Sequence, residues 1–365
     1  MVDFDEFGPE KIMDVYDPKS GMRGLVVIDN TALGPGKGGI RMTPTVNPGE
    51  VARLARTMTW KNSLAGLPFG GAKSGIIADD KKISKQKKET IVKAFSKALR
   101  IVSPGMYIAA PDMSMAEQEM RWFAEANGDS RACTGKPKDM GGLPHELGST
   151  GWGVFHATAV AAPFAGMNLR NASVAIEGFG NVGWFAAKFL TEHGARLVAV
   201  SDSKGVVYNG NGIDLGRLVE AKKRTGSVVN YEQADRTCCD SILDVRSDIL
   251  ITAALPDLIK PSDVDRLNFR LIVEGSNIPM TPAVEQLCMR RGILVVPDFV
   301  ANAGGVISSY VEYMNGTEAQ MFAMIEERIS LNTRLVLDDA TRRGLPPRQS
   351  AMDLAVKRVR DSMER

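Results

Sequence analysis

The chain contains few residues of the kinds that build metal centres and disulfide frameworks. Its 365 residues include three histidines and four cysteines. The histidines (His145, His156 and His193) stand at no ligand spacing, and the cysteines form no C-x-x-C motif. Zinc sites usually combine closely spaced histidines and cysteines, so the sequence predicts no metal site. The same cysteine pattern fits a reducing cytoplasm.

The sequence also lacks a charge excess and long apolar runs. Lysine and arginine number 45 against 43 aspartates and glutamates, which leaves a net charge of +2. No global field therefore attracts nucleic acid or an anionic membrane. Residues 1–11 show no signal-peptide pattern, and no stretch approaches the roughly 20 apolar residues of a membrane span. We expect a cytoplasmic protein without nucleic-acid or membrane partners.

Length and composition indicate a globular protein of two domains. Hydrophobic residues make up 44% of the chain, and 365 residues exceed what one core usually serves. The pattern predicts an α/β domain over 1–150, joined by a C-terminal helix at 336–365, and a Rossmann-like doubly wound domain over 151–335. The second prediction depends on near-continuous apolar runs, which are typical of parallel strands covered on both faces. These runs are 173–179, 196–202, 248–254, 271–276 and 293–299.

In the first 150 residues, strand and cap signals mark several elements. The β-branched run 24–29 predicts a strand. Asn47 and Pro48 predict a helix start, in which Asn47 caps and Pro48 takes the first helical position. The run 106–112 predicts a strand that presents Asp112 at its carboxyl end.

A dinucleotide-binding fingerprint follows the first apolar run of the second domain. Gly178, Gly180 and Gly183 form a G-x-G-x-x-G motif after a strand pattern and before a helical one. This order places a pyrophosphate on the N–H groups at the positive end of a helix. At the end of the next run, Asp202 can accept hydrogen bonds from an adenosine ribose, which favours NAD. The neighbouring Ser203 and a lysine could instead hold the 2′-phosphate of NADP.

The stretch LPFGGAKSG, at 67–75, surrounds Lys73 with small residues. Its glycines let a ligand or another backbone approach closely, so a phosphate cradle and a catalytic amine are competing hypotheses. A Walker motif requires G-x-x-x-x-G-K-[ST] after a strand. Here Ala72 separates the second glycine from the lysine, and a helix pattern precedes the motif. A nucleoside triphosphatase is therefore the weaker hypothesis.

Lys37, Lys61 and Lys73 all have glycine-rich or helix-end surroundings. If the fold brings them into one site, mutual repulsion and burial lower the pKa of the least solvated amine. A lysine with a lowered pKa can act as a base near neutral pH. We expect this role for Lys73.

Seven long motifs, in this order, resemble those of the glutamate/leucine/phenylalanine/valine dehydrogenase family, and most closely its glutamate enzymes. The resemblance covers about residues 20–315. It implies two α/β domains with the active site in the cleft between them, and NAD(P)-dependent oxidation of an amino acid to a 2-oxo acid and ammonia. The motifs are GPGKGGIRM, MTWKNSLAGLPFGGAKSG, AAPDM, GFGNVG, SDSKG, EGSNIPMTP and VPDFVANAGGV.

The resemblance also implies roles for individual residues. Lys73 would activate water against the imino acid carbon, Asp112 would exchange the proton of the substrate nitrogen, and Lys61 would hold the α-carboxylate. Residues of the GSTGWG and ANAGG motifs would lie near the nicotinamide of the cofactor. The full predicted cofactor set is Thr150, Gly178, Gly180, Asn181, Val182, Gly183, Asp202, Ser203, Asn277 and Asn302.

Substrate choice depends on Lys37. Glutamate enzymes of the family carry lysine in the GP-x-K-GG motif, where it pairs with the γ-carboxylate, whereas leucine-type enzymes carry an apolar residue. Ser309 matches a serine that also contacts that carboxylate. A desolvated carboxylate needs such partners, so we expect L-glutamate, 2-oxoglutarate and ammonium as substrates.

Two alternatives remain from the sequence. One is a leucine-, valine- or phenylalanine-type dehydrogenase. The other is a catalytically silent nucleotide-binding homologue, because Ser74 stands where the family usually has glycine. The resemblance further implies a homo-oligomer, with a hexamer favoured over other states from dimer to octamer.

Overall fold

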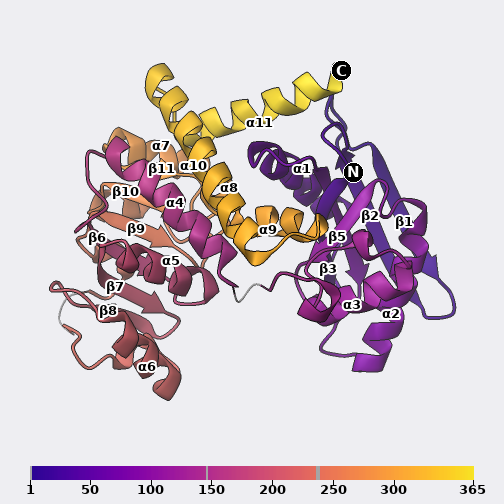
Figure 1. Cartoon of the computed structure of the whole chain (residues 1–365), viewed down its shortest axis with the longest axis horizontal. Coiled ribbons are helices and arrows are strands. Elements are labelled where there is room, and N and C mark those ends of the chain that lie inside the picture. Colours follow the sequence, from indigo (N-terminus) through magenta and orange to yellow (C-terminus); the bar gives the residue numbers. More distant parts are fainter. Residues whose placement is uncertain (1, 145–146, 236–238) are drawn as a thin grey trace. The chain divides into compact units, whose positions relative to one another are not determined.

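The computed structural model describes residues 2–144, 147–235 and 239–365. The chain forms two compact units, here called unit 1 and unit 2 (Figure 1). Unit 1 comprises residues 1–147, 306–321 and 352–365, and unit 2 comprises residues 148–305 and 322–351. Each unit contains a β-sheet with helices, so the predicted two-part α/β class is confirmed. The predicted division at residues 150 and 335 stays a prediction about functional domains.

Unit 1 contains a mixed five-stranded sheet in the order β1-β2-β4-β3-β5. The pairs β1/β2 and β2/β4 are antiparallel, whereas β3 pairs in parallel with both β4 and β5. The strands are β1 (Lys11–Asp17), β2 (Met22–Asn30), β3 (Gly36–Thr43), β4 (Gly70–Ile77) and β5 (Tyr107–Pro111), and the helices are α1 (Pro48–Leu64), α2 (Lys85–Ala98) and α3 (Glu117–Asn127).

Residues 24–29 of β2 are buried on both faces of the sheet of unit 1, which explains the apolar run predicted as a strand there. Alternate side chains of a strand point to opposite faces. Val26 and Ile28 of β2 belong to the core shared with α2 and α3, whereas Leu25 and Val27 pack with α1 residues. We name these two sides of the sheet the α2/α3 face and the α1 face.

Helix α1 begins as the sequence predicts. Asn47 is its N-cap, and the Asn47 side-chain oxygen accepts a hydrogen bond from the Glu50 N–H at 3.1 Å. Pro48 occupies the first turn, where its missing N–H leaves no hydrogen bond unmade.

The glycine-rich stretch around Lys73 forms strand β4, which the sequence analysis did not assign. Its glycines allow close packing. A Cβ on Gly71 would lie 2.0 Å from the Thr59 hydroxyl oxygen of α1, and a Cβ on Gly38 would lie 1.7 Å from the Ala72 carbonyl oxygen. Contacts among β3, β4 and α1 therefore explain why Gly38 and Gly71 have no side chain, and no phosphate ligand is needed to explain them.

Unit 2 contains a six-stranded sheet in the order β11-β10-β9-β6-β7-β8 (Figure 1). All pairs are parallel except β7/β8, which is antiparallel and was not expected. The five predicted parallel strands are confirmed. The strands are β6 (Ser173–Glu177), β7 (Arg196–Asp202), β8 (Gly205–Tyr208), β9 (Ile249–Thr252), β10 (Leu271–Glu274) and β11 (Leu294–Val296).

Helices of unit 2 include α4 (Ser149–Phe164), α5 (Asn181–Glu192), α6 (Leu215–Thr225), α7 (Pro282–Arg290) and α8 (Asp298–Ala301). Three later helices contribute residues to both units: α9 (Gly304–Tyr313), α10 (Glu318–Arg343) and α11 (Pro347–Met363). Within the described ranges, no helix is long and apolar enough to cross a membrane.

Candidate active site

Lys73 and Asp112 form an ion pair in unit 1, with 2.8 Å between Lys73 Nζ and Asp112 Oδ2. Lys73 lies in β4 and is 7% exposed. Asp112 directly follows β5, so the strand presents it at its carboxyl end as predicted. Gly39 of β3 lies between the two, and a Cβ there would stand 2.8 Å from Asp112 Cβ and 3.2 Å from Lys73 Nζ. A glycine at this position therefore leaves space for the pair.

Arg41 is a second cation on Asp112. Its Nε lies 3.0 Å from Asp112 Oδ2, and its NH1 lies 2.6 Å from Glu50 Oε1. The guanidinium is held between two carboxylates, so it stays fixed beside Asp112. The sequence analysis missed this residue, although Arg41 stands inside the quoted GPGKGGIRM motif.

The site shifts the pKa values of both members of the pair. Burial lowers the pKa of Lys73, although the Asp112 carboxylate opposes this shift. Burial alone would raise the pKa of Asp112, but the Lys73 ammonium and the Arg41 guanidinium lower it overall. Asp112 is therefore ionised near neutral pH, and Lys73 loses its proton more easily than an exposed lysine. Such a shifted pair is what proton transfer requires.

Lys37 lies in β3, on the same α1 face as Lys73, because it pairs in register with Gly71 of the neighbouring strand. Its amine is buried, and Nζ donates a hydrogen bond to the Ala109 carbonyl oxygen at 3.0 Å. Burial lowers the pKa of Lys37 to about 7, and the charges of Lys136 and Lys73 add to the effect. A carboxylate ligand would reverse this shift.

The other two predicted substrate residues also belong to unit 1. Lys61 is half-buried in the last turn of α1. The next residue, Asn62, donates to the Gly70 carbonyl oxygen at 2.7 Å, which ties this turn to β4. Ser309 is half-buried in α9. Their predicted contacts with the two substrate carboxylates stay predictions.

Ser74 faces away from Lys73. Neighbouring residues of a strand point to opposite faces, and the buried Ser74 hydroxyl lies 2.8 Å from the Tyr107 hydroxyl on the α2/α3 face. The Tyr107 hydroxyl in turn donates to the Gly38 carbonyl oxygen at 3.1 Å. Serine in place of glycine therefore adds a core hydrogen bond and leaves the α1 face unchanged.

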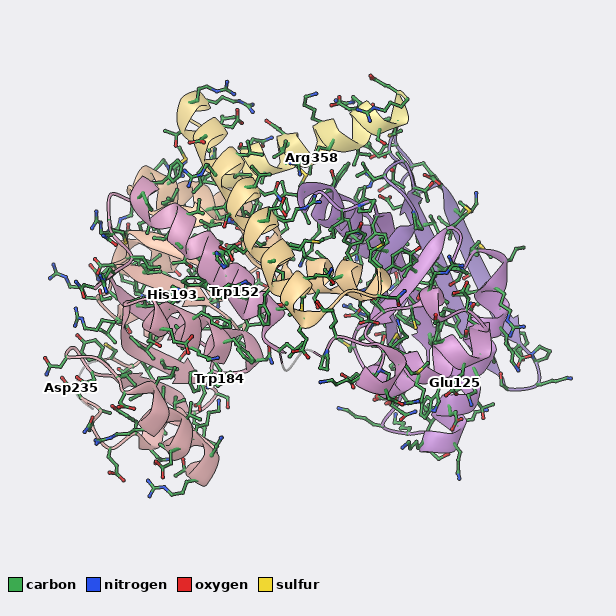
Figure 2. All side chains as sticks on the ribbon, in the orientation of Figure 1. Glu125, Trp152, Trp184, His193, Asp235 and Arg358 are labelled. Carbon is green, nitrogen blue, oxygen red and sulfur yellow. The ribbon has the colours of Figure 1, made fainter. Side chains whose placement is uncertain are left out.

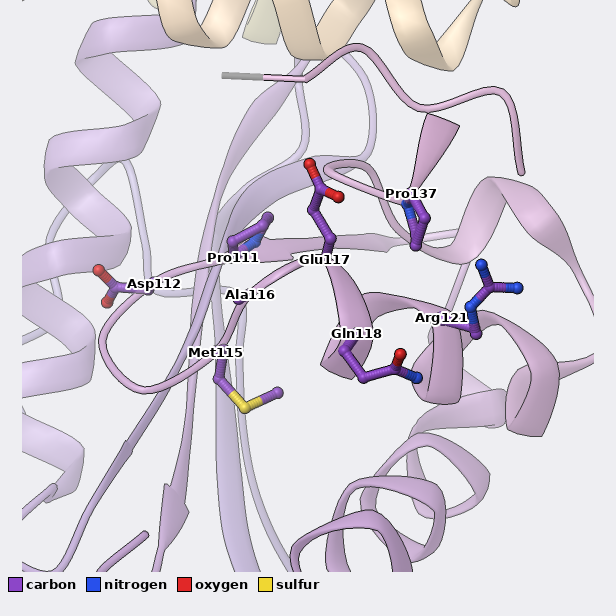
Figure 3. A pocket seen from close by; sticks show the side chains of 8 residues that line it. All are labelled: Pro111, Asp112, Met115, Ala116, Glu117, Gln118, Arg121 and Pro137. Carbon is purple, nitrogen blue, oxygen red and sulfur yellow. The ribbon is translucent and has the colours of Figure 1, made fainter. Parts of the chain in front are cut away.

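A pocket of about 720 Å³ opens beside Asp112 (Figure 3). Asp112 lies at one end of the labelled lining and Arg121 of α3 at the other. The lining combines polar and apolar side chains, and none of the predicted lysines is among them. Its residues are Pro111, Asp112, Met115, Ala116, Glu117, Gln118, Arg121 and Pro137.

Next to Pro137 of this pocket, Lys136 and Glu312 form a buried ion pair that the sequence did not predict. Lys136 Nζ lies 2.7 Å from Glu312 Oε1 of α9, and both side chains are almost fully buried. The Glu312 carboxylate also accepts from the N–H groups of Gly135 at 3.0 Å and Leu143 at 3.2 Å. Glu312 therefore fixes the 135–143 segment to α9. No sequence signal joins residues 176 positions apart.

In unit 2, the structure requires glycine at Gly178 and Gly183 of the fingerprint, but leaves space for a side chain at Gly180. Gly178 has a φ of +86°, where other residues are strained, and a Cβ on Gly183 would lie 1.9 Å from the Gly178 carbonyl oxygen. A Cβ on Gly180 would meet nothing within 4 Å. Gly180 precedes α5, whose N-terminus has no side-chain cap. The N–H groups at the positive end of this helix, where the predicted Asn181 and Val182 lie, fit the pyrophosphate of a dinucleotide.

Asp202 ends β7 as predicted, and its carboxylate is already hydrogen-bonded. Oδ2 accepts from the Val228 N–H at 2.8 Å, and Oδ1 accepts from the Ser227 hydroxyl at 3.0 Å. Burial raises the Asp202 pKa, but these hydrogen bonds outweigh it and the pKa is lowered. The negative charge is therefore fixed next to Ser203, which is exposed.

The predicted nicotinamide residues gather around α8 and the start of α9. The Asn302 side-chain amide donates to Asn277 Oδ1 at 2.9 Å. A Cβ on Gly304 would lie 2.1 Å from the Ser149 carbonyl oxygen and 3.1 Å from the Thr150 Cα, so α4 and α9 begin in close contact. Thr150, Asn277 and Asn302 therefore belong to neighbouring segments of unit 2.

The two histidines that the structure describes, His156 and His193, pack against aromatic rings. His156 meets the Trp152 ring at 4.3 Å between centroids, and His193 meets the Phe155 ring at 4.3 Å. Trp152 and His193 are labelled in Figure 2. His145 lies outside the described residues. In the described part of the chain, no group of three or more histidine, cysteine or carboxylate side chains could hold a metal ion.

Two family models together match most of the chain. The profile described as Glutamate/Leucine/Phenylalanine/Valine dehydrogenase matches residues 141–365, and the Glu/Leu/Phe/Val dehydrogenase dimerisation domain matches residues 9–128. The chain is 40% identical to a glutamate dehydrogenase of Aeropyrum pernix, over 92% of this chain and 84% of the relative.

Two further comparisons agree. The chain is 39% identical to an NADP-specific glutamate dehydrogenase of Saccharolobus shibatae, over 86% of this chain and 74% of the relative. The crystal structure of a hetero-hexameric glutamate dehydrogenase from Thermus thermophilus, in a leucine-bound form, superposes with a TM-score of 0.83 at 29% identity, and covers 97% of this chain and 89% of that chain.

Proposed function

Because the chain belongs to the glutamate/leucine/phenylalanine/valine dehydrogenase family and is an NAD(P)-dependent amino acid dehydrogenase, we propose that it oxidises L-glutamate. The reaction converts L-glutamate, water and NAD(P)⁺ into 2-oxoglutarate, ammonium, NAD(P)H and a proton. Unit 1 would bind the amino acid and unit 2 the dinucleotide. The observation that supports this proposal most strongly is the ion pair between the buried Lys73 and the half-buried Asp112.

Lys73 would act on water. Its lowered pKa makes the neutral amine easier to form than in an exposed lysine, and a neutral amine can accept a proton from water as the oxygen attacks the imino carbon. The bound nicotinamide supplies the chemistry of hydride acceptance. The negative charge of Asp112 next to this amine stabilises the cationic imino group of the substrate.

Asp112 would exchange the proton of the substrate nitrogen. Lys73 and Arg41 keep this carboxylate ionised, so it can take a proton from the substrate ammonium before oxidation and return one to the leaving ammonia. Arg41 would act through Asp112 and is therefore a positioning residue.

Lys37 supports glutamate over apolar substrates. A buried amine with a pKa of about 7 is only partly charged at pH 7, and it gains a charged partner when a carboxylate binds beside it. A leucine side chain would leave the same amine unpaired. Lys37 and Ser309 are therefore the proposed contacts of the γ-carboxylate, and Lys61 is the proposed contact of the α-carboxylate.

The proposed cofactor is NAD rather than NADP. The Asp202 carboxylate holds negative charge where a 2′-phosphate would approach. Dissociation constants of NAD⁺ and NADP⁺, measured for the wild type and for Asp202→Ser, test this choice. The Asp202→Ser substitution should weaken NAD⁺ binding and strengthen NADP⁺ binding. Tighter NADP⁺ binding by the wild type would reverse the assignment.

We propose a homohexamer, for which the six subunits of the similar hetero-hexameric Thermus thermophilus enzyme are the support. We also propose a cytoplasmic location. The solution mass, measured by light scattering, distinguishes a hexamer from the alternatives between dimer and octamer.

The function itself is tested by a substrate panel. Reduction of NAD⁺ and NADP⁺ is measured with L-glutamate, L-leucine, L-valine and L-phenylalanine. The proposal expects a higher kcat/KM with L-glutamate than with the other three. Preference for an apolar amino acid would assign the chain to that branch of the family, and cofactor binding without turnover would identify a silent homologue.

A further inference from the structure

Three carboxyl groups surround the guanidinium of Arg348 in unit 2. Arg348 NH2 lies 2.9 Å from Glu274 Oε2 and 2.9 Å from Asp298 Oδ1, and Arg348 Nε lies 2.7 Å from Glu285 Oε1. The Glu274 side chain is fully buried, and that of Glu285 is 3% exposed. Three acidic groups therefore share one permanent positive charge away from water.

One oxygen of this cluster has no hydrogen-bond donor if all three carboxyl groups are ionised. Glu274 Oε2 accepts from Arg348 and from the Asp298 N–H, whereas Glu274 Oε1 is buried and accepts from no group. The carboxyl groups of Glu274 and Glu285 are held close together, because both contact the guanidinium of Arg348. Two ionised carboxylates so close together repel, but one proton between them gives a hydrogen bond and lowers the negative charge of the cluster by one.

We propose that Glu274 and Glu285 share one proton, and that this pair, through Arg348 and Asp298, positions the Asn277–Asn302 contact of the dinucleotide site. The proton-sharing part is independent of the proposed function. The positioning part depends on it only because Asn277 and Asn302 are assigned as cofactor residues.

The cluster is connected directly to that contact. Glu274 ends β10, and the next residues lead to Asn277. Asp298 starts α8, which is followed by Asn302, and Asp298 Oδ2 accepts from the Ile278 N–H at 3.0 Å. Both segments that carry the asparagines are therefore fastened to the Glu274–Asp298–Arg348 cluster.

Other groups near the cluster do not supply the missing charge. Burial raises the pKa of the Cys288 thiol of α7 to about 11, so this thiol is neutral at pH 7. Arg291 acts on Cys288 and follows the same helix. Burial also raises the pKa values of Glu274 and Glu285, and their mutual repulsion adds to the rise at Glu274.

A shared proton makes the folding stability depend on pH, and this dependence can be measured. Because the folded pKa lies above the unfolded value, the folded protein binds one proton more than the unfolded chain over the range between the two. The stability that this proton contributes is therefore fully present below the unfolded pKa and is lost as the pH rises through the folded pKa, by up to about tenfold in the folding equilibrium constant per pH unit. Glu285→Gln removes the titrating group but keeps an amide donor for Glu274 Oε1.

The experiment measures denaturant unfolding and NAD⁺ affinity of the full chain between pH 5 and 9. The variants are Glu285→Gln, Arg348→Met and the control Arg266→Met, which removes an exposed arginine paired with Asp244 and Asp263 in the same unit. Infrared difference spectra between wild type and Glu285→Gln at pH 7 report a protonated carboxyl group directly.

We expect the wild type and Arg266→Met to lose stability and NAD⁺ affinity as the pH rises. In Glu285→Gln this pH dependence should be smaller by the equivalent of one bound proton. Arg348→Met should weaken NAD⁺ binding about tenfold or more. Absence of the protonated-carboxyl band together with equal pH dependence in wild type and Glu285→Gln would overturn proton sharing. NAD⁺ affinity that is unaffected by both substitutions would overturn positioning. Failure to oxidise glutamate would leave these results unchanged and would contradict only the proposed function.

Discussion

The Lys73 ammonium of β4 contacts the Asp112 carboxylate at 2.8 Å, and Asp112 directly follows β5 of the same sheet. The two residues are brought together because β3 lies between β4 and β5 and has glycine at position 39. A lysine whose pKa is lowered by burial and an ionised carboxylate, joined directly, form the unit from which the proposed chemistry follows.

Arg41 should control the acidic limb of the pH profile. Arg41→Met removes one of the two cations that lower the pKa of Asp112, so the acidic limb of kcat/KM should move upward by about one pH unit. Glu50→Gln is the matched control, because it contacts Arg41 but not Asp112. Equal profiles for Arg41→Met and wild type would show that Asp112 does not control that limb.

Lys37 should select the γ-carboxylate. Loss of a hydrogen bond to a charged group costs about 1.5–3 kcal/mol, so Lys37→Leu should raise the KM for glutamate about 10- to 100-fold and shift preference toward apolar amino acids. Kinetics with L-glutamate and L-leucine measure this shift. Unchanged selectivity would refute the assigned role.

The pKa of Lys37 adds a pH dependence to that binding. The amine is charged below about pH 7 and neutral above it, so glutarate affinity should be constant at lower pH and should fall as the pH rises above 7. Glutarate is a suitable probe because it has no amine of its own. Lys37→Leu should abolish this dependence, and butyrate, which lacks the second carboxylate, should not show it. A dependence that persists in Lys37→Leu would assign it to another group.

Gly180 should be needed for ligand binding rather than for folding. A Cβ there meets no protein atom within 4 Å, so Gly180→Ala should fold normally but weaken dinucleotide binding about tenfold or more, since overpacking costs about 1–3 kcal/mol. Gly183→Ala should instead lower stability, because its Cβ would lie 1.9 Å from the Gly178 carbonyl oxygen. Gly105→Ala, another open site, is the control for both properties. Normal NAD⁺ binding by Gly180→Ala would contradict a pyrophosphate at α5.

Local signals predicted the elements whose reasons are local. Asn47 and Pro48 fixed the start of α1, and the apolar runs identified the parallel strands of unit 2, since both patterns depend on neighbouring residues. Strand β4 was missed because glycine has a low strand propensity. It forms because β2 and β3 pair with it on both sides, and that pairing depends on the rest of the fold.

Long-range contacts in the site also escaped the sequence. Arg41 and Asp112 stand 71 positions apart, and Arg348 contacts Glu274 across 74 positions. Neither pair has a spacing that a local pattern can report. The family motifs identified Lys73 and Asp112, whereas Arg41, Glu312 and the Arg348 cluster required the packed structure.

Lys73→Ala provides the most direct test of the central claim, that Lys73 and Asp112 of unit 1 perform the chemistry while unit 2 binds the dinucleotide. Glutamate-dependent NAD(P)⁺ reduction and NAD(P)H binding by fluorescence are measured on the same protein. We predict a loss of turnover of about 10²- to 10⁴-fold, the usual contribution of a general base, with cofactor affinity nearly unchanged. Retained turnover, or loss of turnover and cofactor binding together, would contradict the account.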